Sequence, residues 1–192
     1  MMQYPNRKNT RLKTFDYNSV GAYFITVCTQ NKEHLLSQIV HKDSCVGTGV
    51  LDGPQTNEKI CVELNGYGKI VDKYINQPND FYNNISVDYY VIMPNHIHLL
   101  IYVSENGPSG TPVPTELVCV ENSIQNSIIS KFISTFKRFC NKEIGKNIWQ
   151  MRSFDHIIRD ERDYEFHVKY IRENPLKWYF NSENHDDIML YE

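Results

Sequence analysis

The sequence has no long apolar run and no apolar leader. No uninterrupted hydrophobic stretch approaches the ~20 residues that a transmembrane helix needs. The first residues, MMQYPNRKNTRLK, are polar and basic, whereas a secretory signal peptide carries an apolar segment. We therefore expect a soluble, cytoplasmic protein without a membrane partner.

Cysteine pairs at metal-binding or redox spacing are also missing. The five cysteines are an odd number, lie far apart and include no C-x-x-C pair: Cys28, Cys45, Cys61, Cys119 and Cys140. Such a distribution favours reduced thiols, and it argues against a disulfide framework or a cysteine-based zinc site.

An excess of positive charge is absent too. The formal net charge of -3 at pH 7 argues against a polybasic protein that binds any nucleic acid through summed attraction to phosphate. Contact with nucleic acid must then come from a local patch. Arg7, Lys8, Arg11 and Lys13 form one candidate, and the same residues could equally be a solvated chain end.

What the sequence has is the composition of an ordinary globular domain. With 192 residues, of which 41% are hydrophobic and 22% charged, the chain is long enough to bury a sizeable core. We interpret residues 1–192 as a single domain with a basic N-terminal arm at 1–16, loop insertions at about 41–60 and 104–117, and a tail at 179–192.

Apolar periodicity predicts alternating strands and helices. Strands are expected over 21–29, 85–93 and 96–103 and within an extended segment at 148–158; helices are expected from Glu63 to about Gln77, from Ile128 to about Lys142, which would be the longest, and from Asp160 to about Asn174. A loop or irregular hairpin is expected within residues 31–60, where residues 35–40 could form a short strand. Pro175 should end the last helix because the residue before a proline is disfavoured in the α conformation.

Two histidines lie one residue apart at the start of a predicted strand. The Pro94-Asn95 break makes the strands on either side of it antiparallel neighbours. Strand side chains alternate between faces, so His96 and His98 project from the same face. Neutral imidazole is a common metal ligand, and the pair could supply half of a divalent-metal site. Alternatively, the histidines are hydrogen-bonded core or edge residues.

The last predicted helix carries two different stripes. One is apolar and should face the core, with Tyr164, Val168 and Ile171; the other is polar, with Asp163, His167, Tyr170 and Asn174. The polar stripe could be only the solvent side of an amphipathic helix. It also places a phenol and a carboxamide one turn apart on the same side.

Four motifs in this order resemble a known family. They are MPNHIHLLI at 93–101, IWQ at 148–150, FDHIIRD at 154–160 and YIRENP at 170–175. Together they resemble the HUH single-tyrosine transposases, most closely the REP-associated tyrosine transposases, which are relatives of insertion-sequence transposases. The resemblance runs from about Tyr17 to Trp178, and it implies an α+β, ferredoxin-like (RRM-like) antiparallel sheet with helices on one face, of the HUH endonuclease type.

The resemblance also implies a set of site residues. Matched by motif, His96 and His98 would bind Mg²⁺ or Mn²⁺, and Tyr170 would be the nucleophile. Asn174, one turn after the tyrosine, would be a further metal ligand, although some relatives carry glutamine there and Asn174 could instead cap the helix. Two other tyrosines compete for the catalytic role: Tyr164 on the core face, and Tyr179 beyond the proline.

By the same resemblance, the protein would be a metal-dependent single-stranded DNA endonuclease and strand transferase. A phenol with an ordinary pKa near ~10 is a poor nucleophile at neutral pH, and a bound cation would offset the charge that builds on the phosphate. The product would be a 5′-phosphotyrosine at a hairpin-containing site, made by a monomer or a homodimer. Alternatives are a non-catalytic nucleic-acid binder and a metal-dependent hydrolytic nuclease.

Cationic residues would hold the DNA in this interpretation. Arg7, Lys8 and Arg11 would contact the foot of the hairpin, and Arg152 and Arg159 would lie near the active site. All five could equally be ordinary surface charges.

Overall fold

A computed structural model describes residues 18–41, 60–77, 82–104 and 127–181. The helices and strands, in chain order, are β1 (Gly21–Cys28), a short 3-10 helix η1 (Gln30–Lys32), β2 (Ser37–His41), β3 (Ile60–Leu64), α1 (Gly66–Ile75), β4 (Ile85–Ile92), β5 (His96–Val103), α2 (Ile128–Ile144), β6 (Phe154–Ile157) and α3 (Glu161–Asn181). No helix among these residues is both long and apolar enough to cross a membrane.

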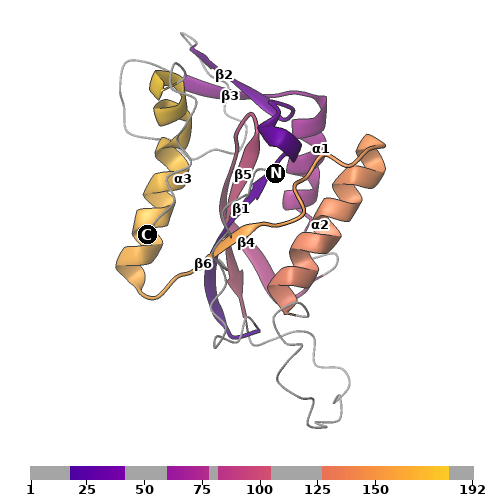
Figure 1. The fold of residues 1–192 in the computed structure, drawn as a ribbon. Helices are drawn as coiled ribbons and strands as arrows, with labels where there is room; N and C mark the ends of the chain where they lie inside the picture. Colours follow the sequence, from indigo (N-terminus) through magenta and orange to yellow (C-terminus); the bar gives the residue numbers. More distant parts are fainter. Residues whose placement is uncertain (1–17, 42–59, 78–81, 105–126, 182–192) are drawn as a thin grey trace, which may run out of the picture.

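The centre of the molecule is a four-stranded sheet in the order β4-β5-β1-β6 (Figure 1). Every neighbouring pair is antiparallel, and β5 pairs with β1 along its whole length, from His96 opposite Cys28 to Val103 opposite Gly21. The chain crosses from β3 to β4 through α1 and from β5 to β6 through α2. The predicted α+β class with an antiparallel sheet is confirmed.

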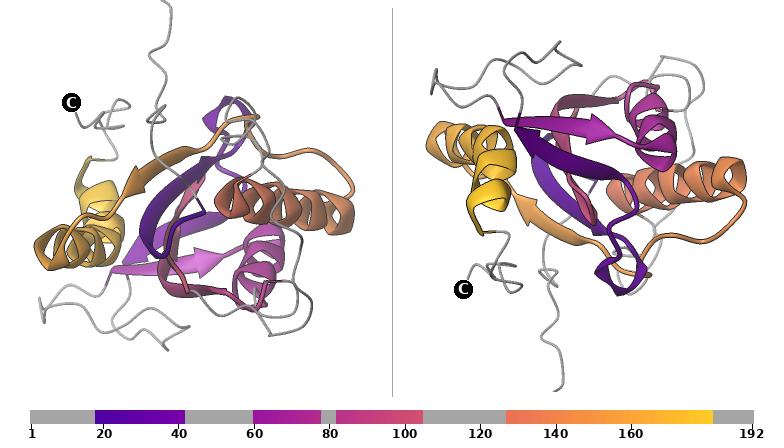
Figure 2. Two further views of the ribbon diagram at one scale, coloured as in Figure 1. Left: turned by 90° about the horizontal axis from the view of Figure 1, so that it is seen from below. Right: turned by 90° about the horizontal axis from the view of Figure 1, so that it is seen from above.

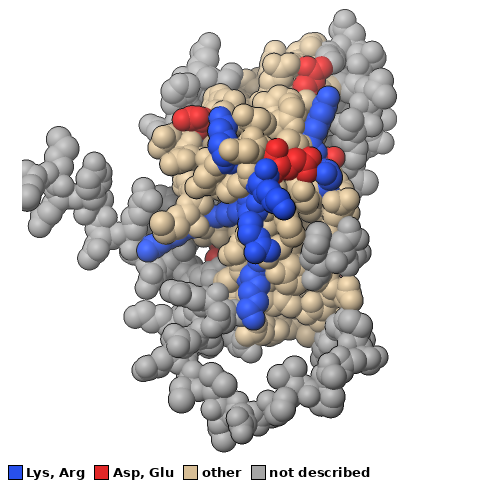
Figure 3. Space-filling model, turned by 90° about the vertical axis from the view of Figure 1, so that its right-hand side faces the viewer, with Lys and Arg blue, Asp and Glu red and all other residues tan. Residues whose placement is uncertain are grey.

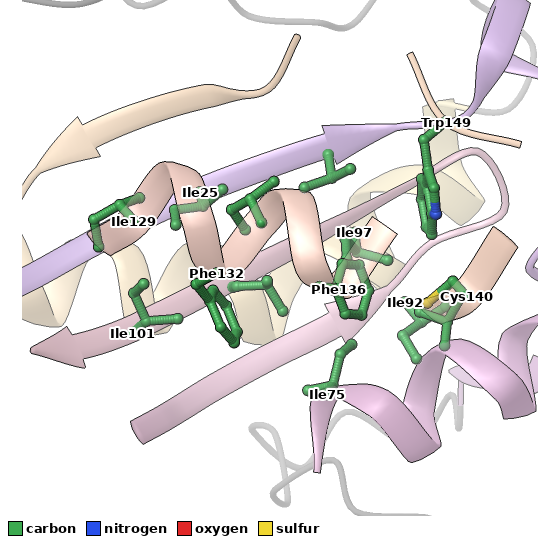
Figure 4. Packing of buried hydrophobic residues seen from close by; sticks show 14 of the residues in the cluster. Ile25, Ile75, Ile92, Ile97, Ile101, Ile129, Phe132, Phe136, Cys140 and Trp149 are labelled. Atoms are coloured by element: carbon green, nitrogen blue, oxygen red, sulfur yellow. The ribbon is translucent and has the colours of Figure 1, made fainter. Parts of the chain in front are cut away.

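Alternation along the strands divides the sheet into two faces. On one face, Tyr23, Ile25 and Val27 of β1 are almost completely buried in the main core. Figure 4 shows this core, in which Phe132 and Phe136 of α2 lie over the strands. The helices α1 and α2 therefore cover one face of the sheet, as predicted.

The third helix covers the opposite face. Figure 2 shows α3 and α2 on opposite sides of the sheet. Phe24 of β1, which points away from the main core, packs in a second buried cluster with Leu100 of β5 and Ile171 of α3. The sequence prediction of helices on one face thus holds for α1 and α2, and α3 adds a second layer because its own apolar stripe needs a surface to bury.

The chain before α1 forms a hairpin and not a helical turn. β2 and β3 pair as a separate two-stranded antiparallel sheet, with Ser37 opposite Leu64. The helix expected from Glu63 begins at Gly66 instead, because the Asn65 side chain accepts a hydrogen bond from the Gly68 N–H and caps it. The loop or irregular hairpin expected within residues 31–60 is a regular antiparallel hairpin in its described part, and the possible short strand at residues 35–40 corresponds to β2.

The predicted end of the last helix is wrong. α3 passes through Pro175 and continues to Asn181, which makes it longer than α2. A proline inside a helix removes one backbone hydrogen bond, and packing has to offset that loss. Here Pro175 is buried, and Trp178 beyond it packs against the His34 and His96 rings. The expected start of the helix is confirmed, because the Asp160 carboxylate accepts a hydrogen bond from the Asp163 N–H and caps α3.

Several predictions fall on residues outside the described part of the chain. These are the N-terminal arm at 1–16 with Arg7, Lys8 and Arg11, most of the insertions at 41–60 and 104–117, and the tail beyond Asn181. The expectation of reduced cysteines holds for Cys28 and Cys140, which are free thiols, but Cys61 in β3 is disulfide-bonded.

Candidate metal and tyrosine site

The two histidines of β5 converge on one point of the sheet face that α3 covers. The Nε2 atoms of His96 and His98 are 3.0 Å apart. The other ring nitrogen of each is also engaged, because His98 Nδ1 lies 2.8 Å from Thr26 Oγ1 and His96 Nδ1 lies 2.6 Å from Asn95 Oδ1. Strand alternation thus places the pair as predicted, and neighbours in β1 and the β4–β5 turn fix both rings.

Burial keeps both imidazoles neutral. It lowers the pKa of His96 to about 4, with Lys32 and His34 adding charge repulsion. Burial lowers the pKa of His98 well below its ordinary value, and the neighbouring His96 and His167 lower it further. Since only the neutral ring offers a lone pair to a metal, the environment favours the ligand form of both side chains at neutral pH.

The residues present fit a divalent cation. Two ligands that lie about 2.1 Å from one ion and subtend a right angle are roughly 3.0 Å apart, which matches the 3.0 Å between the two Nε2 atoms. The outer nitrogens of both rings have side-chain oxygen partners, as is typical of histidines that bind metals. Imidazole binds transition metals more readily than it binds Mg²⁺, so the donor set favours Mn²⁺ of the two expected ions.

Tyr170 of α3 lies beside this pair. Its ring meets the His98 ring edge-on at 5.2 Å between centroids, and meets the Phe24 ring at 5.8 Å. The ammonium group of Lys177 lies 5.6 Å from the centre of the same ring. The packing of α3 on the sheet therefore brings Tyr170 into contact with His98, which lies 72 positions earlier in the chain.

The two rival tyrosines are placed differently. The Tyr164 hydroxyl donates a hydrogen bond to the Asp88 carboxylate at 3.0 Å, and burial together with that bond raises its pKa. Tyr179 lies near the end of α3, where it is 37% exposed and its ring packs against His41. Tyr170 contacts the His98 ring, whereas Tyr164 bonds to Asp88 and Tyr179 packs on His41.

The polar stripe of α3 faces the sheet and not the solvent. His167 and Asn174 are only 6% and 8% exposed. Asn174 follows Tyr170 by one turn on this buried side, and because α3 continues beyond it, Asn174 is not a helix cap. The interpretation of the stripe as a solvent face is therefore wrong.

A second histidine cluster, not predicted from the sequence, lies at the start of α3. His156 of β6 contacts the Asp163 carboxylate at 2.9 Å, and His167 Nδ1 lies 3.1 Å from the other oxygen of that carboxylate. One ligand atom from each of these three side chains lies within 4.8 Å of the other two, so the three could share an ion. The signal in the sequence was the Asp163–His167 spacing of one helical turn, together with the His in FDHIIRD.

The predicted DNA-binding arginines do not lie together. Arg159 is exposed beside the second cluster, where its backbone N–H donates to Asp163. Arg152 is exposed and lies next to α2. Its neighbour in the chain, Met151, accepts a hydrogen bond at its carbonyl oxygen from Lys137 of α2.

A different group of cations lies on α2. Figure 3 shows Lys and Arg side chains gathered on this side of the molecule, with some acidic groups among them. Lys131, Arg138 and Lys142 are exposed and recur at helical spacing along α2. This basic stripe lies across the sheet from α3, and therefore away from Tyr170.

No protein-family model matches the chain. An uncharacterized protein of Haemophilus influenzae is 29% identical over 180 residues, which is 90% of each chain. The REP-associated tyrosine transposase of Escherichia coli is 29% identical over 91 residues, or 47% of this chain and 44% of that protein. A second Haemophilus influenzae protein with that family name is 31% identical over 86 residues, or 45% of this chain and 47% of its own length. The alignments with the two named relatives span less than half of either relative.

The fold is also similar to that of a solved structure. It is a REP-associated tyrosine transposase bound to a REP hairpin, which matches 92% of this chain and 74% of that chain with a TM-score of 0.52 and 20% identity. At that identity the likeness carries the fold alone. With the named relatives, it confirms the resemblance that the four sequence motifs indicate.

Proposed function

Because the chain is a relative of the REP-associated tyrosine transposases, we propose that it cleaves and rejoins single-stranded DNA beside a hairpin. In this proposal Tyr170 is the nucleophile, and His96, His98 and Asn174 hold a divalent cation, Mn²⁺ or Mg²⁺. The observation that carries it is the meeting of three side chains from distant parts of the sequence: two imidazoles with Nε2 atoms 3.0 Å apart, and a phenol ring 5.2 Å from one of them.

The proposed reaction exchanges one phosphate ester for another. The Tyr170 oxygen bonds to phosphorus, and the bond from phosphorus to the 3′-oxygen breaks. The tyrosine proton is lost and the leaving 3′-oxygen gains one, which yields a 5′-phosphotyrosine and a free 3′-hydroxyl. Because no water enters and the ester is conserved, a 3′-hydroxyl from the same or another strand can reverse the step and join two ends.

The side chains around Tyr170 support this chemistry. A bound cation would polarise the scissile phosphate and neutralise its oxygens. Lys177, 5.6 Å from the centre of the Tyr170 ring, adds positive charge near a phenol that must lose its proton. The edge-on contacts with His98 and Phe24 hold the ring against the sheet, so little ordering is needed before attack.

Asn174 is the proposed third ligand. It lies one helical turn from Tyr170 and is 8% exposed. A carboxamide oxygen is a ligand that divalent cations accept. Placing a ligand and the nucleophile on one helix ties the position of Tyr170 to that of the cation.

The test is to mix the protein with Mn²⁺ and a labelled oligonucleotide that carries a hairpin and a single-stranded tail, then to separate the products on a denaturing gel. We expect labelled DNA that migrates with the protein, and its loss in Tyr170→Phe. Tyr164→Phe and Tyr179→Phe are matched controls that should retain the adduct.

Three other results would contradict the proposal. An adduct formed by the Tyr170→Phe protein would move the nucleophile to another residue. Cleaved DNA free of protein would make the chain a hydrolytic nuclease. Bound but intact DNA would make it a non-catalytic nucleic-acid binder.

A further inference from the structure

The cluster at the start of α3 has the composition of a metal site. Asp163 and His167 are one turn apart on α3, and His156 reaches them from the edge strand β6. His156 Nε2 lies 2.9 Å from Asp163 Oδ2, and His167 Nδ1 lies 3.1 Å from Asp163 Oδ1. One ligand atom from each side chain can be chosen so that all three lie within 4.8 Å of one another.

We propose that His156, Asp163 and His167 form a second cation site, which binds a transition-metal dication of the Zn²⁺ class and fastens α3 to β6. Two imidazoles and one carboxylate suit such metals better than Mg²⁺ or Ca²⁺, which prefer oxygen ligands alone. Three protein ligands leave a coordination position for water.

This site is separate from the His96–His98 pair. Phe24 lies on β1, the strand between β5 with His98 and β6 with His156. Its ring centroid is 5.1 Å from that of His98 and 4.5 Å from that of His167. Phe24 is 3% exposed and offers no ligand atom. A single ion therefore cannot be shared, and the two clusters should bind independently.

The environment of Asp163 suits a cation. Burial alone would raise the pKa of Asp163, but hydrogen bonds from His156 and from the Arg159 N–H outweigh it and hold that pKa below its ordinary value. The carboxylate is thus ionised at neutral pH. The side chains of His156 and Asp163 are 33% and 20% exposed, so an ion can enter from solvent.

Without an ion, the same atoms are joined by hydrogen bonds. His167 Nδ1 lies 2.8 Å from the main-chain oxygen of Asp163. His156 Nε2 lies 2.9 Å from Oδ2 and 3.1 Å from Oδ1 of the Asp163 carboxylate. Since a neutral imidazole can move its proton to its other nitrogen, both rings can turn a lone pair toward an ion. The ion then replaces hydrogen bonds that already link β6 to α3.

The experiment counts ions in a chain that lacks the first site. In a His96→Ala/His98→Ala background, Co²⁺ titration followed by visible absorption, and Zn²⁺ titration by calorimetry, should give one ion per chain. Adding Asp163→Asn or His156→Gln should remove it. Zn²⁺ should raise the Tm of the background protein, a chelator should reverse the rise, and the Asp163→Asn protein should not respond.

His34→Gln, which changes an exposed histidine outside the cluster, is the matched control and should leave the count at one. Circular dichroism of each variant checks folding, and His156→Gln replaces Asp163→Asn if the latter unfolds. An ion that persists in the folded Asp163→Asn or His156→Gln protein, or a background chain that binds none, overturns the proposal. Because no readout uses DNA, its failure leaves the transposase chemistry untouched.

Discussion

At the scale of single residues, Thr26 has two roles at the histidine pair. Without a cation, its hydroxyl can donate to His98 Nδ1, His98 Nε2–H can donate to His96 Nε2, and His96 Nδ1–H can donate to Asn95. With a cation, His98 must carry its proton on Nδ1, and Thr26 must accept. A hydroxyl can do either.

Thr26→Val should therefore weaken cation binding at this pair. The valine has nearly the same shape but cannot accept the His98 Nδ1 proton, so we expect Mn²⁺ affinity to fall about 10–100-fold, as for other losses of a partner behind a metal ligand. Calorimetric Mn²⁺ titration measures it, with Thr26→Ser as the rescue variant.

The matched control is Thr135→Val, because the Thr135 hydroxyl contacts Tyr82 on α2's side of the sheet. Its Mn²⁺ affinity should equal that of the parent chain. Equal affinities for Thr26→Val and the parent chain would show that Thr26 does not orient His98.

Acid should destabilise the metal-free protein through His96. The native pKa of about 4 lies below the ordinary value of 6.5, so between these values the unfolded chain binds a proton that the native chain does not. The free energy of unfolding should thus fall as pH drops from 6.5 toward 4, by at most about 3 kcal/mol from this residue. Urea unfolding in chelator at several pH values tests it, and His96→Gln should lessen the slope.

The sequence predicted the site residues unevenly. Strand alternation was enough to place His96 and His98 together, because the period of two is local. The contact of Tyr170 with His98 joins distant residues, so only the family resemblance could indicate it. His156 and His167 were missed as a site because a polar stripe of Asp163, His167 and Asn174 looks the same in sequence whether it faces water or a sheet.

At the scale of elements, α1 packs so closely on the chain before β2 that one of its glycines is required. A Cβ at Gly68 would collide with the main-chain oxygen of Leu36 and lie 3.2 Å from the Leu64 Cβ, whereas a Cβ at Gly66 would meet nothing within 4 Å. Gly68→Ala should therefore lower the free energy of unfolding by about 1–3 kcal/mol.

Gly66→Ala is the matched control on the same helix, and it should be neutral or stabilising by up to about 1 kcal/mol, since alanine favours the helix. Urea unfolding of both proteins measures the difference. A Gly68→Ala protein as stable as Gly66→Ala would mean that α1 does not approach Leu36 closely.

The course of α3 shows where local rules stop. The sequence rule that a helix ends before proline considers the backbone alone, and it predicts an end at Asn174. In the structure the turn beyond Pro175 is held by Trp178, which packs on His34 and His96. The packing of Trp178, which no local sequence pattern predicts, therefore overrides the preference of the helix to end before proline. It also brings a third aromatic ring beside the histidine pair.

At the scale of the whole molecule, the sheet separates the large apolar core from the candidate site residues. The α1 and α2 side buries the large apolar cluster, while the α3 side carries both histidine clusters and Tyr170. The order of strands and helices was predictable from apolar periodicity. The side on which α3 packs was not, because its apolar stripe fits either face.

This separation bears on where DNA binds, given a net charge of -3 for the whole chain. A DNA strand whose phosphate reaches Tyr170 must run along the α3 side, where Arg159 is exposed. The cations Lys131, Arg138 and Lys142 lie on α2, across the sheet. Arg159→Ala should thus weaken binding of a short single-stranded oligonucleotide and lower its salt slope by up to about 0.7, the value for one phosphate contact.

The triple variant Lys131→Ala/Arg138→Ala/Lys142→Ala removes more charge from the opposite side and should leave both affinity and slope unchanged. Fluorescence anisotropy at several salt concentrations compares the two proteins with the parent chain. If the salt dependence of DNA affinity becomes shallower in the triple variant but not in Arg159→Ala, the DNA binds at α2. Because the sheet then stands between that surface and α3, the same phosphate could not reach Tyr170, and the assignment of the nucleophile would fail with it.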